Sequence, residues 1–125
     1  MLRGRLRVPE SILDIIERLE NLIEEIVRTF DPLSVIIAGS LAEGRFVRGL
    51  SDLDLLVVLN YPVPEDKRFM LRAIEDVDVE ITLISLEELK RAVYDGRDFY
   101  VSAVRNGIVV YGKNLNADLN GNLKS

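Results

Sequence analysis

The stretch Gly39-Ser40-Leu41-Ala42-Glu43-Gly44, followed by Ser51-Asp52-Leu53-Asp54-Leu55-Leu56-Val57-Val58, decides how the chain is interpreted. Aliphatic and β-branched runs lie on either side of the Gly-Ser pair, and such short runs are typical of buried strands. Asp52 and Asp54 are separated by one residue, so on an extended strand both carboxylates point to the same face. Two like charges on one face repel each other unless a cation lies between them. A Gly-Ser turn beside them can offer N–H groups and a hydroxyl to a phosphate, which predicts a site for a metal-bound nucleotide.

Composition excludes several other kinds of chemistry. The chain has 125 residues, 48% of them apolar, which is enough for one domain with one core. It contains no cysteine and no histidine, which excludes disulfides, thiolate metal sites, imidazole catalysis and the usual zinc sites. Catalysis must therefore use carboxylates, hydroxyls, Lys, Arg and hard cations such as Mg²⁺.

Charge and hydropathy indicate which partners to expect. The net charge of −5 argues against nucleic acid as the primary partner, since such binders neutralise phosphates with Lys and Arg. No apolar run approaches the roughly 20 residues of a membrane span, and the start lacks a signal-peptide core. We therefore expect a cytoplasmic protein without a membrane partner.

The pattern along the chain predicts an α/β (α+β) domain in which helices cover a small mixed sheet. We expect an N-terminal arm at 1–10, a domain at 11–112 and a flexible tail at 113–125. Ser11 and Asp14 have capping-box spacing at the start of an amphipathic helix that ends at Asp31-Pro32. A second capping box, Ser85 with Glu88, begins another helix. The remaining elements expected are strands at about 33–38, 51–59, 76–84 and 108–111, a short helix at 41–45, and helical segments at 65–75 and 98–105.

A third carboxylate comes from the segment 76–84, whose period-two alternation places Asp78, Glu80 and Thr82 on one face. If this strand lies beside 51–59, Glu80 completes a cluster with Asp52 and Asp54. Three such carboxylates can hold two Mg²⁺ ions roughly 4 Å apart and activate a hydroxyl nucleophile. Asp78 is the competing third carboxylate, and a simply solvated polar face is the alternative to any metal site.

These residues resemble the signature of the DNA polymerase β-like nucleotidyltransferase superfamily, and within it the minimal nucleotidyltransferases. The resemblance spans about residues 11–111 and includes 79–88, similar to the third strand and following helix, and 106–112, similar to the usual ending. It implies a polymerase β-like fold in which Asp52, Asp54 and Glu80 are the catalytic metal ligands. It also implies a nucleotide-binding set around the Gly-Ser turn: Gly39, Ser40, Ser51, Arg45 and Arg48.

Two positions depart from the family pattern. Glu80 stands where active members usually have the shorter Asp. Glu43 stands where many relatives have Arg, so Arg45 or Arg48 would have to neutralise the phosphates.

The resemblance implies Mg²⁺-dependent transfer of a nucleoside monophosphate, AMP from ATP in the simplest case, to a hydroxyl acceptor. Little chain remains to hold that acceptor, so a second copy or a protein partner would supply the surface. The family suggests a helical HEPN-type protein, with this chain as the antitoxin of a toxin–antitoxin pair. The alternative is a catalytically weak or inactive nucleotide-binding module that acts by docking a partner.

Overall fold

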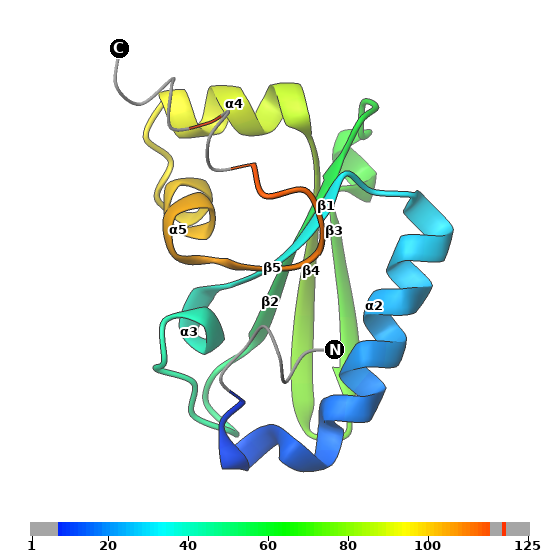
Figure 1. The fold of residues 1–125 in the computed structure, drawn as a ribbon, viewed down its shortest axis with the longest axis vertical. Coiled ribbons are helices and arrows are strands. Elements are labelled where there is room, and N and C mark those ends of the chain that lie inside the picture. Colours follow the sequence, from blue (N-terminus) through cyan, green and yellow to red (C-terminus); the bar gives the residue numbers. More distant parts are fainter. Residues whose placement is uncertain (1–7, 116–118, 120–125) are drawn as a thin grey trace.

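A five-stranded mixed sheet forms the centre of the protein (Figure 1). A computed structural model describes residues 8–115 and 119. The strand order is β3-β4-β2-β1-β5; β2 and β4 are parallel, and all other neighbours are antiparallel. The strands are β1 (Ser34–Ala38), β2 (Leu53–Leu59), β3 (Phe69–Ile74), β4 (Val77–Ser85) and β5 (Ile108–Gly112). The expected α/β (α+β) class with a mixed sheet is confirmed.

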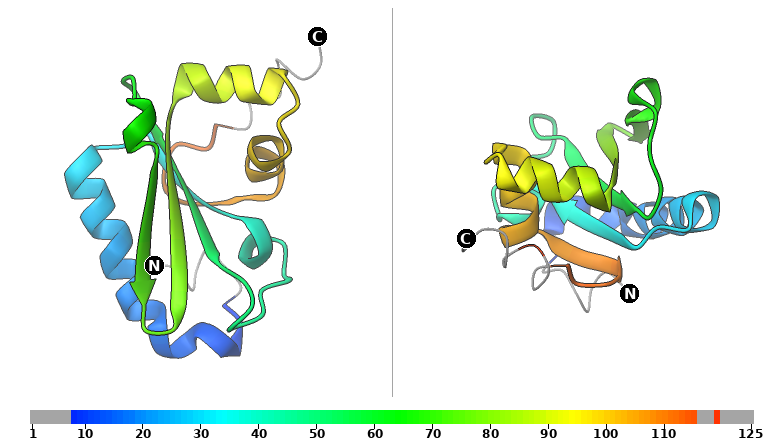
Figure 2. Two further views of the ribbon diagram at one scale, coloured as in Figure 1. Left: turned by 180° about the vertical axis from the view of Figure 1, so that it is seen from behind. Right: turned by 90° about the horizontal axis from the view of Figure 1, so that it is seen from above.

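Helices cover both faces of the sheet, with α2 on one face and α3, α4 and α5 on the other (Figures 1 and 2). The helical elements are the 3₁₀ helices η1 (Glu10–Ile15) and η2 (Glu65–Lys67) and the α-helices α2 (Ile16–Phe30), α3 (Gly39–Ala42), α4 (Leu86–Tyr94) and α5 (Asp98–Asn106). Within the described ranges, no helix has the length and apolar character that crossing a membrane requires.

Strand β2 shows why the sheet has two cores. Its residues Leu53, Leu55 and Val57 pack in the cluster under α2, whereas Leu56 and Val58 pack in the cluster under α4 and α5. Burying each such side chain contributes about 1.5–3 kcal/mol, so a central strand that is apolar on both faces holds the two layers together. By this alternation Asp54 lies on the α4–α5 face, at the end of the strand where the apolar run begins.

The segment 65–75, expected to be helical, instead forms the short η2 helix and the edge strand β3. β3 pairs with β4 in antiparallel register, and Ile74 opposite Val77 closes a two-residue turn. The positive φ of Glu75, 55°, allows this tight turn without a glycine. Hydrogen bonding to an existing strand outweighs the helical propensity of the segment, because β propensity depends on the neighbouring strand.

The expected capping box at Ser11 is also wrong. The first turn is 3₁₀, Pro9 precedes it without a side-chain cap, and α2 begins at Ile16. Arg48 binds one group of the expected capping box, the Asp14 carboxylate, and its guanidinium also donates to the Ser11 carbonyl. A tertiary ion pair therefore replaces the local cap.

The end of α2 and the start of α4 agree with the prediction, whereas the short helix expected at 41–45 lies earlier, as α3 at Gly39–Ala42. α2 ends at Phe30, and its C-cap, Asp31, adopts a left-handed conformation (φ 47°) before Pro32. Ser85 caps α4, and its hydroxyl accepts a hydrogen bond from the Glu88 amide at 3.1 Å.

The expected tail at 113–125 contributes to the core in its described part, because Leu115 and Leu119 are buried in the cluster under α4 and α5. Of the expected arm, only its last residues, Val8 to Glu10, fall within the described ranges.

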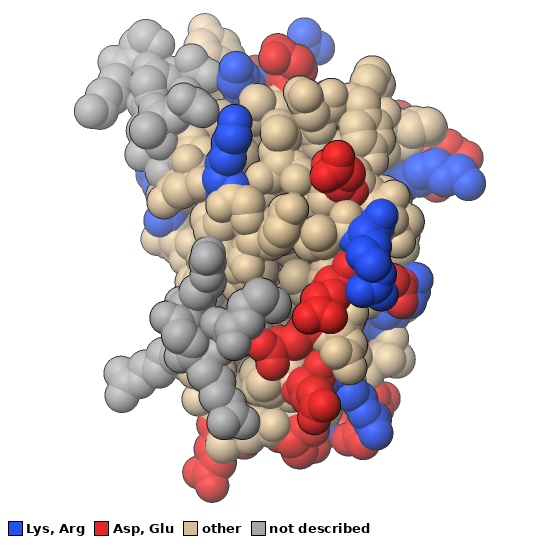
Figure 3. All heavy atoms as spheres, turned by 45° about the vertical axis from the view of Figure 1, so that its right-hand side comes forward, with Lys and Arg blue, Asp and Glu red and all other residues tan. Residues whose placement is uncertain are grey.

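The polar side of α2 is tied to the β3–β4 hairpin by exposed ion pairs. Arg18 lies 3.0 Å from Glu75, and Arg72 of β3 lies 3.0 Å from Glu25. Acidic and basic side chains are interspersed on the side of the molecule that Figure 3 brings forward. Such a solvated surface contributes little to stability per pair.

Candidate active site

The Gly39-Ser40 turn lies directly against Asp54. Ala38, the last residue of β1, pairs with Asp54 of antiparallel β2, and the chain then turns into α3. Gly39 has a φ of 65°, and a Cβ built on it would come within 2.2 Å of Asp54 Oδ2. Only glycine combines this backbone conformation with so close an approach. The Gly39-Ser40 turn and the Asp54 carboxylate thus form one local structure.

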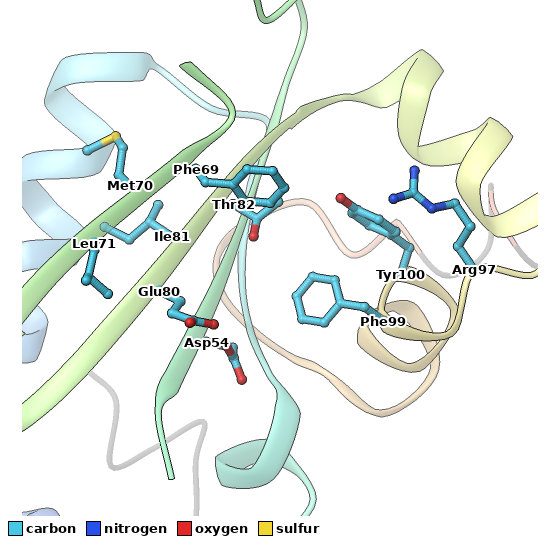
Figure 4. A pocket seen from close by; sticks show the side chains of 10 residues that line it. All are labelled: Asp54, Phe69, Met70, Leu71, Glu80, Ile81, Thr82, Arg97, Phe99 and Tyr100. Atoms are coloured by element: carbon cyan, nitrogen blue, oxygen red, sulfur yellow. The ribbon is translucent and has the colours of Figure 1, made fainter. Parts of the chain in front are cut away.

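Asp54 and Glu80 meet across the parallel β2–β4 pair. They are direct register partners, and their carboxylates point toward one another (Figure 4). Asp78 lies two residues before Glu80 on the same face, opposite Ala73 of β3 and beyond the start of β2. Of the two candidate third carboxylates, the sheet register therefore brings Glu80 to Asp54.

The electrostatics of this pair indicate an unbalanced negative charge. Burial raises the pKa of Asp54 to about 7, helped by a hydrogen bond shared with Glu80 and by the charges of Glu80 and Asp52. Two carboxylates in this position favour either a shared proton or a cation between them. Their oxygens are the hard donors that Mg²⁺ prefers, so the pair fits such an ion.

Asp52 stands apart from this pair. It is exposed and precedes the first residue of β2, Leu53. Its charge acts on Asp54, but within residues 8–115 and 119 no three acidic side chains are gathered closely enough to hold a metal ion. The expected three-carboxylate cluster is therefore assembled as a pair, with its third member on the adjoining loop.

The remaining predicted nucleotide-binding residues divide between the site and the scaffold. Ser51 stabilises the loop before Asp52, since its hydroxyl accepts a hydrogen bond from the Val47 amide at 2.9 Å. Arg45 is exposed and its guanidinium pairs with Glu43 at 2.9 Å, while its backbone amide donates to the Ser40 carbonyl at 2.8 Å.

Arg48 is engaged elsewhere. Its guanidinium lies 2.6 Å from both Asp14 and Asp76, joining η1 to the β3–β4 turn. The hydrogen bonds with these two carboxylates raise the pKa of Arg48 and lower those of Asp14 and Asp76. The structure therefore gives Arg48 a scaffold contact and does not bring it to Asp54 and Glu80.

Glu43 links the two helices beside the site. Its carboxylate accepts hydrogen bonds from Arg45 and from Ser102 of α5, at 2.9 and 3.1 Å, and both bonds lower its pKa. The residue that occupies the family's frequent Arg position thus anchors α3 to α5.

A cleft of about 720 Å³ opens beside the acidic pair, between β3–β4 and the start of α5 (Figure 4). This volume lies in the range of small-molecule sites. Ten side chains line it: Asp54, Phe69, Met70, Leu71, Glu80, Ile81, Thr82, Arg97, Phe99 and Tyr100. The sequence pointed to two of these, Asp54 and Glu80. The aromatic residues had no motif, although Phe69-x-Leu71 would have indicated a strand face had β3 been expected.

A solved structure shares this fold. A crystal structure of a nucleotidyltransferase-like protein from Exiguobacterium sibiricum 255-15 is similar, with a TM-score of 0.59 and 14% sequence identity. The similarity covers 87% of this chain and 38% of that chain, and at this identity it concerns the fold alone.

Sequence comparison identifies the family. Residues 19–110 match the nucleotidyltransferase domain family, and the chain belongs to it. A comparison with curated proteins gives no match. The resemblance to polymerase β-like nucleotidyltransferases is thereby confirmed, and the matched range contains the Gly-Ser turn, both aspartates and Glu80.

Proposed function

We propose that this protein transfers a nucleoside monophosphate, AMP from ATP in the first instance, to a hydroxyl group of an acceptor. The observation that carries the proposal is the contiguous arrangement of the Gly39 turn, Asp54 and Glu80 at one end of a ligand-sized cleft. Phosphates and a divalent cation would bind at that end, and the open cleft would receive the rest of the substrates.

In this reaction the acceptor oxygen attacks the α-phosphorus, the bond to the β-phosphate oxygen breaks, and pyrophosphate leaves. The hydroxyl proton passes to a carboxylate of the site or to water. Asp54, with Asp52 from the adjoining loop, would hold Mg²⁺, which neutralises phosphate charge when it is bound. Glu80 would lie on the side of the site at which the acceptor hydroxyl binds. The Gly39-Ser40 turn would orient the phosphates, so that most of the rate gain comes from positioning and charge stabilisation.

The acceptor would be presented by another molecule. One β–α domain provides the acidic site, and its cleft is open beside Glu80, where Leu71 is 66% exposed. A second copy of the chain or a helical HEPN-type protein, modified on a hydroxyl side chain, would suit this arrangement. In the second case the protein acts as the antitoxin of a toxin–antitoxin pair.

The alternative, a nucleotide-binding module with weak or no catalysis, is favoured by one observation. Asp52 is exposed and outside the Asp54–Glu80 pair, so the third ligand must be recruited when substrate binds. A site that has to rearrange could bind Mg-ATP and turn it over poorly.

Label transfer separates these two functions. The purified protein is incubated with Mg²⁺ and either α-labelled or γ-labelled ATP, alone and with candidate acceptors, and labelled macromolecules are identified by mass. Label retained from α-labelled ATP only, and lost in Glu80→Gln, supports nucleotidyl transfer.

Asp78→Asn provides the matched control, because it removes a carboxylate from the same strand face two residues away. Transfer should survive in this variant. A thermal shift with Mg-ATP without transfer to any acceptor would favour the binding module. Absence of a shift at millimolar Mg-ATP would overturn both functions.

A further inference from the structure

We propose that Phe69 of β3 and Phe99 of α5 form the two walls of a nucleobase site at the far end of the cleft. This inference rests on the proposed function and assigns one end of the cleft to the phosphates and the other to the base. The site takes the planar ring of a nucleoside triphosphate by stacking, with little preference for one base over another.

The register of the sheet sets the two ends apart. Leu71 lies opposite Glu80, and Phe69 lies opposite Thr82, two residues further along the same face. Two residues of a strand correspond to about 7 Å, and Phe69 is also one strand further from Asp54. Because the Gly39 turn touches Asp54 on the opposite side, phosphates at the turn and the acidic pair leave the nucleoside to extend toward Phe69.

The two aromatic walls are exposed in the same cleft as Asp54, Glu80 and Arg97. A surface that only formed a core would not expose aromatic rings beside charged groups. Phe69 is 68% exposed and Phe99 36%, although the residues they adjoin, Thr82 and Tyr100, are buried. Figure 4 shows the two rings on different sides of the cleft, Phe69 above the sheet and Phe99 on α5. Aromatic side chains at such positions are the usual platforms on which bases stack, because every base has a π face.

The wall on α5 is held in place before any ligand binds. The ring of Phe99 packs edge-to-face against Tyr100, with centroids 5.2 Å apart and planes at 81°. Tyr100 is buried, and the Arg97 guanidinium lies 4.9 Å from the centroid of its ring. A rigid wall reduces the entropy lost on binding, which favours a stacked ligand.

Charge agrees with this orientation. Arg97 lines the cleft and makes no ion pair with any other described residue. Its guanidinium can donate hydrogen bonds to acceptor atoms on the edge of a base, whereas the acidic pair at the other end requires a cation and phosphate. A nucleoside triphosphate with Mg²⁺ matches both ends of the cleft.

Equilibrium binding of two probes tests the assignment. Mg-ATP contains the base, and Mg-tripolyphosphate contains only the phosphates. Dissociation constants are measured for the wild type, Phe69→Leu, Phe99→Leu and Phe69→Trp, with Tyr94→Leu as the control, an aromatic 73% exposed on α4 and outside the cleft lining. Leucine keeps an apolar side chain and removes the π face, and a thermal melt of each variant establishes that it is folded.

Each leucine variant in the cleft is expected to weaken Mg-ATP binding about tenfold, the effect of losing one stacked base. The constant for Mg-tripolyphosphate stays unchanged, Phe69→Trp retains ATP binding, and Tyr94→Leu alters neither constant. CTP, GTP and UTP should show the same loss as ATP.

Three results would overturn the inference. If both probes weaken together, the aromatic residues support the site as a whole. If ATP binding is unchanged while transfer to an acceptor falls, the rings hold the acceptor and not the base. If Mg-tripolyphosphate and Mg-ATP both fail to bind the wild type, the proposed function fails as well, so the two failures are distinguishable.

Discussion

Replacement of Asp54 by Asn is expected to stabilise the protein at neutral pH when no metal is present. The carboxyl of Asp54 has its pKa raised from 3.8 to about 7, chiefly by burial and then by Glu80. The folded state therefore binds this proton more tightly than the unfolded state. The contribution of this bound proton to the free energy of unfolding is complete below pH 4 and is lost as the pH rises toward 7.

The size of the effect follows from the shift. A difference of about 3 pKa units corresponds to about 4 kcal/mol at the upper limit. Asp54 is half-buried and partly screened by solvent, so we expect about 1–2 kcal/mol at pH 8. The Asp54→Asn substitution removes the charge, and the new amide can donate a hydrogen bond to the Glu80 carboxylate, so the variant lacks this pH dependence.

Chemical denaturation at pH 5 and pH 8 in EDTA measures both free energies of unfolding, with Asp66→Asn as a control for removing an exposed carboxylate. Mg²⁺ should then recover stability in the wild type and not in Asp54→Asn, since the pair has lost one hard oxygen ligand. If Asp54→Asn is no more stable than the wild type at pH 8 in EDTA, this account of the site is refuted.

Four further changes test other parts of the structure. Gly39→Ala should lower the free energy of unfolding by at least about 2 kcal/mol and abolish the thermal shift with Mg-ATP, because the added Cβ meets Asp54 and the φ of this residue is positive. Circular dichroism melts measure the first effect and thermal-shift assays the second. Arg48→Ala should lower the melting temperature, and the loss should shrink in 1 M NaCl, as measured by salt-dependent melts, because its partners are exposed carboxylates. Ser85→Ala should cost about 1 kcal/mol in urea denaturation, through the lost N-cap of α4. Leu115→Ala should cost about 2–3 kcal/mol by the same measurement, and a cost near zero would show that the segment after β5 does not pack in the core.

Local patterns predicted the elements whose stability is decided locally. The rhythm of apolar residues in α2, the Ser85–Glu88 cap and the alternation in β4 each identify an element from neighbouring residues alone. The capping box predicted at Ser11 was wrong because Arg48, far along the sequence, binds Asp14 and the Ser11 carbonyl. The prediction for β3 was wrong because its strand conformation depends on hydrogen bonding to β4 and not on its own residues alone.

The sequence alone determined the chemistry available to this protein. Without histidine or cysteine, and with the Gly39-Ser40 turn ahead of Asp52 and Asp54, it pointed to carboxylates and a hard cation, and to the nucleotidyltransferase family. Tertiary structure decided which acid joins Asp54, because only the parallel register of β2 and β4 distinguishes Glu80 from Asp78. It also decided the walls of the cleft: Phe69 and Phe99 lie on distant segments, and they share a site because α5 covers the face of the sheet on which Phe69 of β3 lies.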